Sequence, residues 1–181
     1  MKLHLVRHPQ PGVDPGVCYG ASDVAVPDAE LARVQAVLEA AGLPGRLPVY
    51  ASPLQRCALL ARRLRPDALH VDARLAEMDF GRWELRPWSA IARAEVDAWA
   101  GDLLHYRPGG AENVLEVAHR VAGFVDALRA GAVEEALVIC HAGTIRLLLA
   151  MRDGLPLAQA ALQAAATPHR IGYGEILLLE F

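Results

Sequence analysis

The sequence predicts an α/β protein in which a mainly parallel sheet lies between two layers of helices, a three-layer α/β/α sandwich. Short apolar runs alternate with longer segments of helical periodicity, which is the order that parallel strands joined by crossover helices require. The chain has 181 residues, of which 54% are hydrophobic. This length suits one large core and is too short for a second full domain. We therefore expect a single domain over residues 1–181.

Five short apolar runs are predicted to form the strands of this sheet. Strands that are buried on both faces are typically near-continuous apolar runs, in contrast to the alternating pattern of a half-exposed strand. The predicted strands are Lys2–Val6, Pro48–Ala51, Leu69–Asp72, Ala136–Cys140 and Glu175–Phe181.

Six segments between and after these runs are predicted to be helical. Apolar residues recur at helical spacing before Gly42, which is expected to end the first helix as a left-handed cap. Ser52 is expected to cap the second helix, with Pro53 at its first position. The longest helix carries an apolar stripe and is expected to end at Gly131. The predicted helices are Leu31–Ala41, Leu54–Leu64, Ser89–Ala100, Glu112–Ala130, Thr144–Met151 and Leu157–Ala166.

Charge and composition argue against several classes of partner. Eighteen basic and 21 acidic residues give a net charge of -3, so the chain lacks the basic field that holds nucleic acid or an anionic membrane. The first apolar run is too short for a signal peptide, and the most apolar stretch is interrupted by His141 and Arg146. Three widely spaced cysteines suit a reducing compartment. We expect a cytoplasmic protein without nucleic-acid or membrane partners, and its oligomeric state is left open.

Charged side chains that suit a phosphate follow the predicted strands. Arg7 and His8 follow the first strand, Arg56 lies shortly after the second, Glu77 after the third, and His141 after the fourth. In open α/β sheets, ligands bind beyond the carboxyl ends of the strands, so these groups are expected to share one edge. The forked donors of arginine match the oxygens of a phosphate. The pattern therefore predicts a site for a small phosphorylated metabolite.

The same groups suggest a chemistry. His8 is a candidate nucleophile toward phosphorus, Glu77 could protonate the departing oxygen, and the remaining cationic groups could hold the transferring phosphoryl oxygens. Gly143 lies at the start of a predicted helix, where free amides favour an anion. Because the protein supplies the positive charge itself, we expect neither a metal nor a cofactor.

Some neighbouring residues leave alternatives open. Asp79 and Glu84 could serve as the acid in place of Glu77. Trp83 and Trp88 flank the acid-bearing segment and could contact an aromatic leaving group, whereas Trp99 is expected to be a packing residue. The other histidines do not show the spacing of metal ligands. They are His4, His70, His105, His119 and His169.

Four segments, in order, resemble motifs of one family. LVRHPQP, SPLQRC, LAEMDFGRWE and CHAGTIR are similar to the Arg-His, second-arginine, acid and second-histidine motifs of the histidine phosphatase superfamily, the phosphoglycerate mutase-like family of branch 1. The resemblance implies a phosphoglycerate mutase-like fold. Within the superfamily, CYGASDVAV together with EMDFGRWELRPW looks most like the α-ribazole phosphatases of cobalamin nucleotide-loop assembly.

The resemblance implies roles for individual residues. It makes His8 the phosphorylated nucleophile and Glu77 the proton donor, and it brings the loop of Tyr19 and Gly20 near the leaving group. The implied phosphate binders are Arg7, Arg56 and His141. The chain departs from the usual glycine, acidic residue and threonine after the nucleophile, where it has Pro9, Gln10 and Pro11. A proline at position 9 removes an amide that could contact phosphate.

These observations favour a metal-independent phosphomonoesterase with a phosphohistidine intermediate, most specifically an α-ribazole 5'-phosphate phosphatase. A phosphoglycerate mutase is one alternative, but only 63 residues separate Glu77 from His141, whereas the mutases that the chain resembles carry an insertion there. A protein phosphohistidine phosphatase is another. A module that binds a phosphometabolite without turning it over is the alternative outside the enzymes, although such a receptor needs neither an acid nor a nucleophile.

Overall fold

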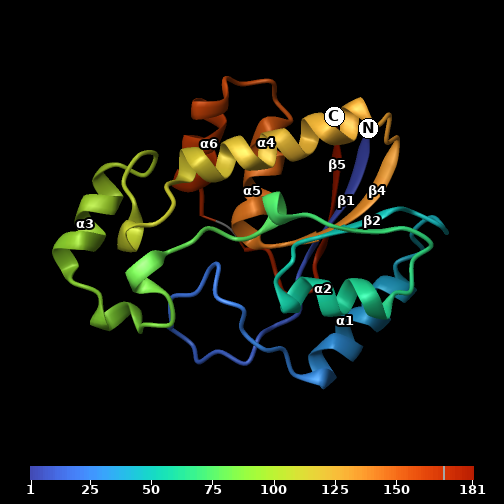
Figure 1. The fold of residues 1–181 in the computed structure, drawn as a ribbon, viewed down its shortest axis with the longest axis horizontal. Coiled ribbons are helices and arrows are strands. Elements are labelled where there is room, and N and C mark those ends of the chain that lie inside the picture. Colours follow the sequence, from blue (N-terminus) through green and yellow to red (C-terminus); the bar gives the residue numbers. More distant parts are fainter. Residues whose placement is uncertain (169) are drawn as a thin grey trace.

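The computed structural model describes residues 1–168 and 170–181 and places a five-stranded sheet between two layers of helices (Figure 1). The strand order is β3-β2-β4-β1-β5. Neighbouring strands are parallel, except that β5 runs antiparallel to β1. The predicted three-layer sandwich with a mainly parallel sheet is confirmed. The strands are β1 (Lys2–Arg7), β2 (Val49–Ala51), β3 (Leu69–Val71), β4 (Glu135–Cys140) and β5 (Ile176–Glu180).

Helices cover both faces of this sheet. In Figure 1, α1 and α2 lie below the sheet, α4, α5 and α6 lie above it, and α3 lies to one side. The helices are α1 (Asp28–Ala40), α2 (Gln55–Arg63), α3 (Arg93–Gly101), α4 (Val114–Ala130), α5 (Ala142–Met151) and α6 (Leu157–Ala166). In the described part of the chain, none of the helices has both the length and the apolar character needed to cross a bilayer.

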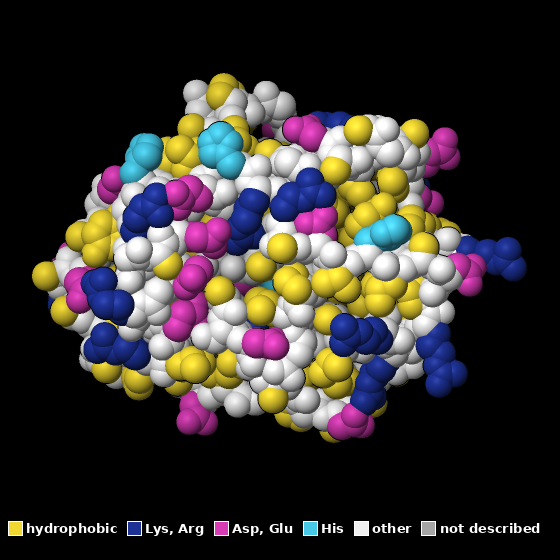
Figure 2. Space-filling model, viewed as in Figure 1, with side chains coloured by type: hydrophobic (Ala, Val, Ile, Leu, Met, Phe, Trp, Pro, Cys, Tyr) yellow, Lys and Arg dark blue, Asp and Glu magenta, His cyan; other side chains and the backbone are white. Residues whose placement is uncertain are grey.

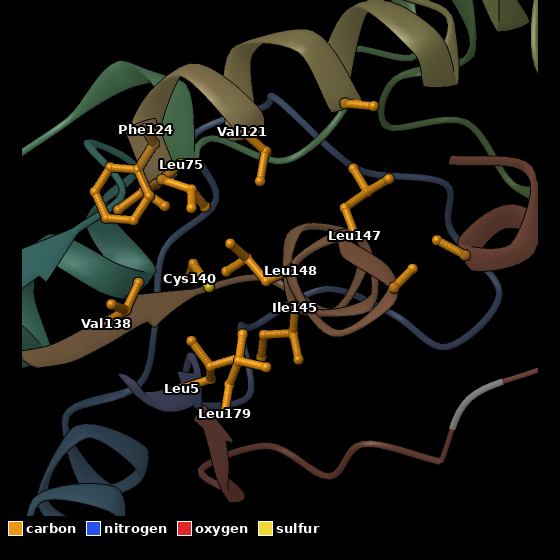
Figure 3. Packing of buried hydrophobic residues seen from close by; sticks show 14 of the residues in the cluster. Leu5, Leu75, Val121, Phe124, Val138, Cys140, Ile145, Leu147, Leu148 and Leu179 are labelled. Carbon is orange, nitrogen blue, oxygen red and sulfur yellow. The ribbon is translucent and has the colours of Figure 1, made fainter. Parts of the chain in front are cut away.

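The central strand β4 divides the main core into two halves. Val138 and Cys140 pack against α4, α5 and α6, whereas Leu137 and Ile139 pack against α1 and α2. Successive side chains of a strand point to opposite faces, so an unbroken apolar run fills both halves. Figure 3 shows Ile145 of α5 beside β-strand residues of the first half. Because both faces of β4 are buried, the strand is held in place, and so is His141, which follows it.

A smaller cluster of aromatic residues packs beside these two halves and contacts the first of them through Phe80. We call it the aromatic cluster, and α3 contributes to it at the side of the molecule (Figure 1). Trp83 is completely buried at its centre, and its ring lies 5.8 Å from that of Trp99 between centroids. Sequence patterns did not reveal this second packing unit. Its aromatic members are Phe80, Trp83, Trp88, Trp99 and Tyr106.

The helix after β2 differs from its prediction. It begins at Gln55, whose amide donates to Oδ1 of Asp23 at 2.6 Å. Ser52 was predicted to cap this helix, but its hydroxyl accepts from the amide of Leu54 at 3.4 Å, one residue before the helix begins, and also lies 2.7 Å from Nε2 of His141. Pro53 accordingly precedes the helix.

Other boundaries moved for local reasons. The helix predicted over Ser89–Ala100 is divided into a short turn at Trp88–Ala90 and α3, because Ile91 between them is extended. The helix predicted from Glu112 starts at Val114, after an Asn113–Glu116 capping box that satisfies its first amides. Gly42 follows α1 with φ +63°, as a left-handed cap requires.

Candidate active site

The sheet register brings two histidines together at the carboxyl ends of β1 and β4. Arg7, the last residue of β1, pairs with Cys140, the last residue of β4. His8 and His141 therefore leave neighbouring strands side by side, and their ring centroids lie 5.0 Å apart. The amide of His8 donates to the carbonyl of Cys140 at 3.0 Å, which holds the chain in place beyond the strand.

His8 presents one unprotonated ring nitrogen. Its Nδ1 lies 2.7 Å from the carbonyl oxygen of Pro9, and because a carbonyl only accepts, Nδ1 carries the proton and Nε2 the lone pair. Burial lowers the pKa of His8 to about 3, and the charges of Arg56 and Arg7 contribute against the opposing effect of the Pro9 hydrogen bond. The ring is therefore neutral near pH 7. Proline lacks an amide but keeps its carbonyl, so Pro9 still orients the histidine.

Arg56 is completely buried and held by the loop after β1. Its terminal nitrogens donate to the carbonyl oxygens of Gly20 and, at 2.7 Å, Ser22. Its Nε donates to Nδ1 of His141 at 3.3 Å. These bonds fix the plane of the guanidinium, so that little side-chain freedom remains to be lost when an anion binds.

The carboxylate of Glu84 holds that loop. It accepts hydrogen bonds from the amides of Gly20, Ala21, Ser22 and Phe80 and from the Ser22 hydroxyl, at 2.6–3.2 Å. Burial opposes its ionisation, but these hydrogen bonds prevail and leave the pKa of Glu84 below its usual value. With five donors around it, Glu84 is a structural anion and not an available acid.

Arg7 offers a donor to the site. Its Nη1 donates to the carbonyl of Ile171, and its guanidinium lies 3.8 Å above the centre of the Tyr173 ring. Among the described residues, none accepts a hydrogen bond from its buried Nε. A buried unpaired donor costs about 1–3 kcal/mol, more when charged. Arg7 also lines the cavity described below, where its positive charge would favour an anion.

His141 lies behind the guanidinium of Arg56. The ring is completely buried, and its Nδ1 accepts from Arg56, so in the neutral tautomer Nε2 donates to the hydroxyl of Ser52 at 2.7 Å. Burial, then the neighbouring charges of His8 and Arg56, lower its pKa well below the usual value. In this arrangement His141 positions Arg56, and its contact with phosphate stays a prediction.

Glu77 is hydrogen-bonded to the start of the helix that follows His141. Its Oε2 accepts from the amide of Gly143 at 3.0 Å, at the start of α5. A Cβ on Gly143 would lie 2.4 Å from Oε1 of Glu77, so the glycine makes room for the carboxylate. Asp79 is engaged elsewhere, since its Oδ1 accepts from the amide of Gly81 at 2.7 Å. Of the three candidate acids, Glu77 lines the cavity described next.

A cavity of about 470 Å³ joins these groups to an apolar wall. Its lining includes Arg7, His8, Arg56, Glu77 and Gly143, together with Tyr19, whose hydroxyl bonds that of Tyr173 at 2.9 Å. The apolar side includes Phe80, Trp88, Trp99 and Leu103. A volume in this range suits a small metabolite, with room beyond a phosphoryl group.

Three expected contacts lie outside the cavity lining, namely Gly20, Trp83 and the completely buried His141. Trp83 is completely buried and donates through Nε1 to Glu95 at 2.9 Å, so the expectation that it contacts substrate is wrong. Gly20 acts through its backbone, and a Cβ there would lie 1.9 Å from the carbonyl oxygen of Met78. Sequence reasoning missed Tyr173 and took Trp99 for a packing residue, although both line the cavity.

The remaining histidines do not form a metal centre within residues 1–168 and 170–181, where no three His, Cys, Asp or Glu side chains gather to hold an ion. His4 bonds Glu135 at 2.8 Å, and His70 stacks on Tyr50. His169 lies outside the described residues. Basic and acidic side chains are interspersed over the face seen in Figure 2, in keeping with the small net charge.

A neutral buried histidine with two arginines, at the end of a parallel sheet, suits an enzyme that acts on phosphate groups. Comparison with known proteins narrows this class. A sequence profile of the histidine phosphatase superfamily (branch 1) matches residues 3–170, and the chain belongs to that superfamily. It is a phosphatase.

One solved structure shares the fold over nearly the whole chain, and two sequence relatives match parts of it. The α-ribazole phosphatase of Shigella flexneri superposes with a TM-score of 0.83 and 24% identity, covering 99% of this chain and 90% of its own. The adenosylcobalamin/α-ribazole phosphatase of Escherichia coli is 30% identical over 115 residues, 60% of this chain and 57% of its own. A candidate phosphoserine phosphatase of Hydrogenobacter thermophilus is 27% identical over 165 residues, 86% and 80% of the two chains.

Proposed function

We propose that this phosphatase hydrolyses a small phosphate monoester without a metal, through a phosphohistidine on His8, and that the ester is α-ribazole 5'-phosphate. One observation carries the mechanism: His8, whose Nε2 is unprotonated, lines the same cavity as Arg7 and Arg56. A nucleophile and two guanidinium charges at one place suit a phosphoryl group.

The reaction proceeds in two balanced steps. Nε2 of His8 attacks phosphorus, the bond from phosphorus to the ester oxygen breaks, and protonated Glu77 gives its proton to that oxygen. Water then attacks the phosphohistidine, Glu77 takes a proton from it, and the phosphorus–nitrogen bond breaks to return neutral His8 and phosphate. Arg7 and Arg56 hold the phosphoryl oxygens in both steps.

The proposed substrate rests on the relatives and on the apolar wall. The E. coli relative, at 30% identity, is named for α-ribazole phosphate, and a benzimidazole riboside offers a flat ring to Phe80, Trp88 and Trp99, which line the cavity. The Hydrogenobacter relative makes phosphoserine the second candidate. Its short polar leaving group would leave that wall uncovered.

Trapping the intermediate tests the mechanism. Enzyme mixed with ³²P-labelled ester should retain label after an alkaline quench and lose it in acid, because the phosphorus–nitrogen bond hydrolyses in acid. His8→Ala should carry no label, whereas His119→Ala, at an exposed position on α4, should label normally. Activity should survive EDTA, and vanadate should inhibit it. An acid-stable label, or one retained by His8→Ala, would place the nucleophile elsewhere.

Competition among purified esters tests the substrate. The specificity constant kcat/KM for α-ribazole 5'-phosphate should exceed those for phosphoserine, phosphoglycerate and a phosphohistidine-bearing carrier protein. A higher value for phosphoserine would replace the proposed substrate and leave the mechanism intact.

A further inference from the structure

The segment that carries Glu77 has little regular structure of its own. After a short turn at Ala73–Leu75, residues 76–80 form neither helix nor strand. The carboxylate of Glu77 accepts from the amides of Met78 and Gly143 at 3.1 and 3.0 Å, but these bonds fix its place only if the backbone behind it is held. A general acid has to lie within hydrogen-bond reach of the oxygen that it protonates. The segment therefore needs an anchor.

An ion pair outside the cavity lining provides this anchor. Arg120 lies in α4, and Glu112 lies just before that helix. The guanidinium of Arg120 donates from Nε to Oε1 of Glu112 at 2.9 Å and from Nη2 to Oε2 at 3.0 Å, a bidentate pair. Neither residue lines the cavity that contains His8. The pair can therefore act on the reaction only through the residues that it holds.

The rest of the guanidinium holds the backbone of the acid-bearing segment. Nη1 of Arg120 donates to the carbonyl oxygens of Arg74 and Ala76 at 2.8 and 2.6 Å, and Nη2 donates to that of Glu77 at 3.3 Å. With the two bonds to Glu112, all five N–H groups of the guanidinium are used. A lysine has three donors on a single nitrogen and could not make these bonds together.

The chain is held on both sides of the acid. Oε2 of Glu112 accepts from the amide of Asp79 at 2.9 Å, and the amide of Glu112 donates to the carbonyl of Asp79 at 3.1 Å. Arg120 holds the carbonyls of Ala76 and Glu77 itself. One ion pair thus fixes the backbone before and after the side chain of Glu77.

We propose that Arg120 is a positioning residue for Glu77, which keeps the acid within reach of the leaving oxygen without touching the substrate. Glu112 acts with it, because it orients the guanidinium and holds Asp79. This inference rests on the proposed phosphatase reaction, in which Glu77 protonates the leaving oxygen. The ion pair should therefore matter for alkyl phosphates, which need that proton, and little for p-nitrophenyl phosphate, which does not.

A double-mutant cycle with Glu77 tests the proposal. The alkyl substrate is α-ribazole 5'-phosphate or, if the enzyme prefers it, phosphoserine. Arg120→Lys keeps the positive charge and loses the forked donors. It should lower kcat/KM for the alkyl ester by about 10- to 100-fold, because a misplacement of about 1 Å can cost about 100-fold. The value for p-nitrophenyl phosphate should change far less. In Glu77→Gln, the same substitution should change the alkyl rate by less than about twofold, because no acid remains to be positioned.

Two further variants complete the experiment. Arg107 is the matched control, because it bonds Glu116 and the carbonyl of Ala111, and none of its hydrogen bonds within the described chain reaches residues 74–79. Arg107→Lys should leave the alkyl-to-aryl ratio unchanged. Glu112→Gln removes the ionic partner but keeps an acceptor oxygen, and should lower the ratio less than Arg120→Lys does. It gives the answer if Arg120→Lys does not fold, which thermal unfolding shows. The ratio of two esters for one variant does not depend on its active fraction.

The outcomes separate this inference from the proposed reaction. If Glu77→Gln slows the alkyl ester selectively but Arg120→Lys slows both esters equally, or has its full effect in Glu77→Gln as well, the positioning role is wrong and the reaction stands. The role is also wrong if Arg120→Lys keeps the parent rate on the alkyl ester. If Glu77→Gln slows both esters equally, or the parent enzyme hydrolyses neither alkyl ester, the proposed reaction and this inference fall together.

Discussion

Replacing Glu84 by glutamine should weaken the fold and the site together. The carboxylate lies outside the cavity lining but binds the loop of residues 20–22, and that loop holds the guanidinium of Arg56 through two carbonyls. Glu84→Gln keeps the size of the side chain, removes its charge and turns one acceptor oxygen into a donor.

The hydrogen bonds of Glu84 set the size of the effect. Its Oε1 accepts from the amides of Ala21 and Phe80, each at 3.0 Å, and Oε2 accepts three bonds from Gly20 and Ser22. The glutamine loses fewest hydrogen bonds when its NH2 group takes the place of Oε1, because only the amides of Ala21 and Phe80 then lose their acceptor. Each bond to a charged group contributes about 1.5–3 kcal/mol, so the loss of two should lower the free energy of unfolding by about 3–6 kcal/mol. For a chain of this length, Tm should fall by about 6 °C or more.

Denaturation and steady-state kinetics provide the assay, with Glu134→Gln as the control because Glu134 is an exposed carboxylate. Urea unfolding at pH 7 measures the loss of stability. The variant should also show a raised KM and a lowered kcat, because Arg56 is less firmly held.

The pKa of Glu84 is lowered in the fold, so the stabilisation that the ionised carboxylate provides is present above about pH 4.3, the usual glutamate value. This stabilisation is lost as the pH falls through the lowered pKa, and the difference between parent and variant should then shrink. A variant as stable and as active as Glu134→Gln at pH 7 would refute the reasoning.

Three further predictions concern the reacting groups. Glu77→Gln should slow an alkyl phosphate by about 10²- to 10⁴-fold and p-nitrophenyl phosphate far less, because nitrophenolate leaves without a proton; equal losses, or a larger loss in Asp79→Asn, would contradict the acid assignment. Gly143→Ala should reproduce this selective loss in the same assay, because its methyl group would lie 2.4 Å from Oε1 of Glu77; unchanged alkyl-ester hydrolysis would show that the carboxylate position is not critical. The folded pKa of His8 is about 3 against 6.5 in a free side chain, so the unfolded chain binds the extra proton between these values. Stability should fall as the pH drops below about 6.5, and urea unfolding of His8→Ala should lose about 2 kcal/mol less between pH 7 and pH 5; parallel pH curves would contradict the burial of a neutral ring.

Sequence reasoning succeeded where local pattern determines the structure. The apolar run ending at Cys140 forms a strand, and the rule for strand ends brought His8 and His141 to one edge because β1 and β4 are parallel neighbours. It failed for side chains whose partners are distant in sequence. Ser52 was expected to cap the helix beside it, but its hydroxyl bonds His141, 89 positions away.

The same limit explains what was missed in and around the cavity. Glu84 remained a candidate acid because its bonds to the loop of residues 20–22 span more than 60 positions. Trp99 was expected to pack in the core, and its ring does contact Trp83. Only the fold shows that Nε1 of Trp99 lacks an acceptor in the described chain while Trp83 has one. Periodicity places a side chain on a face of a helix but does not identify what that face meets.

The separate packing of the aromatic cluster bears on how such enzymes diversify. Trp83 and Ile91 are buried in a cluster of their own, while Val138 and Ile139 of β4, next to the histidines, belong to the two halves of the main core. Substitutions at distant, independently packed positions usually have additive effects on stability. Changes in the aromatic cluster at positions other than Phe80, which also packs against the main core, would then leave the strand ends of the sheet undisturbed. A lineage built on this fold can therefore acquire new leaving groups by mutation at one end of the cavity while inheriting its phosphoryl chemistry unaltered at the other.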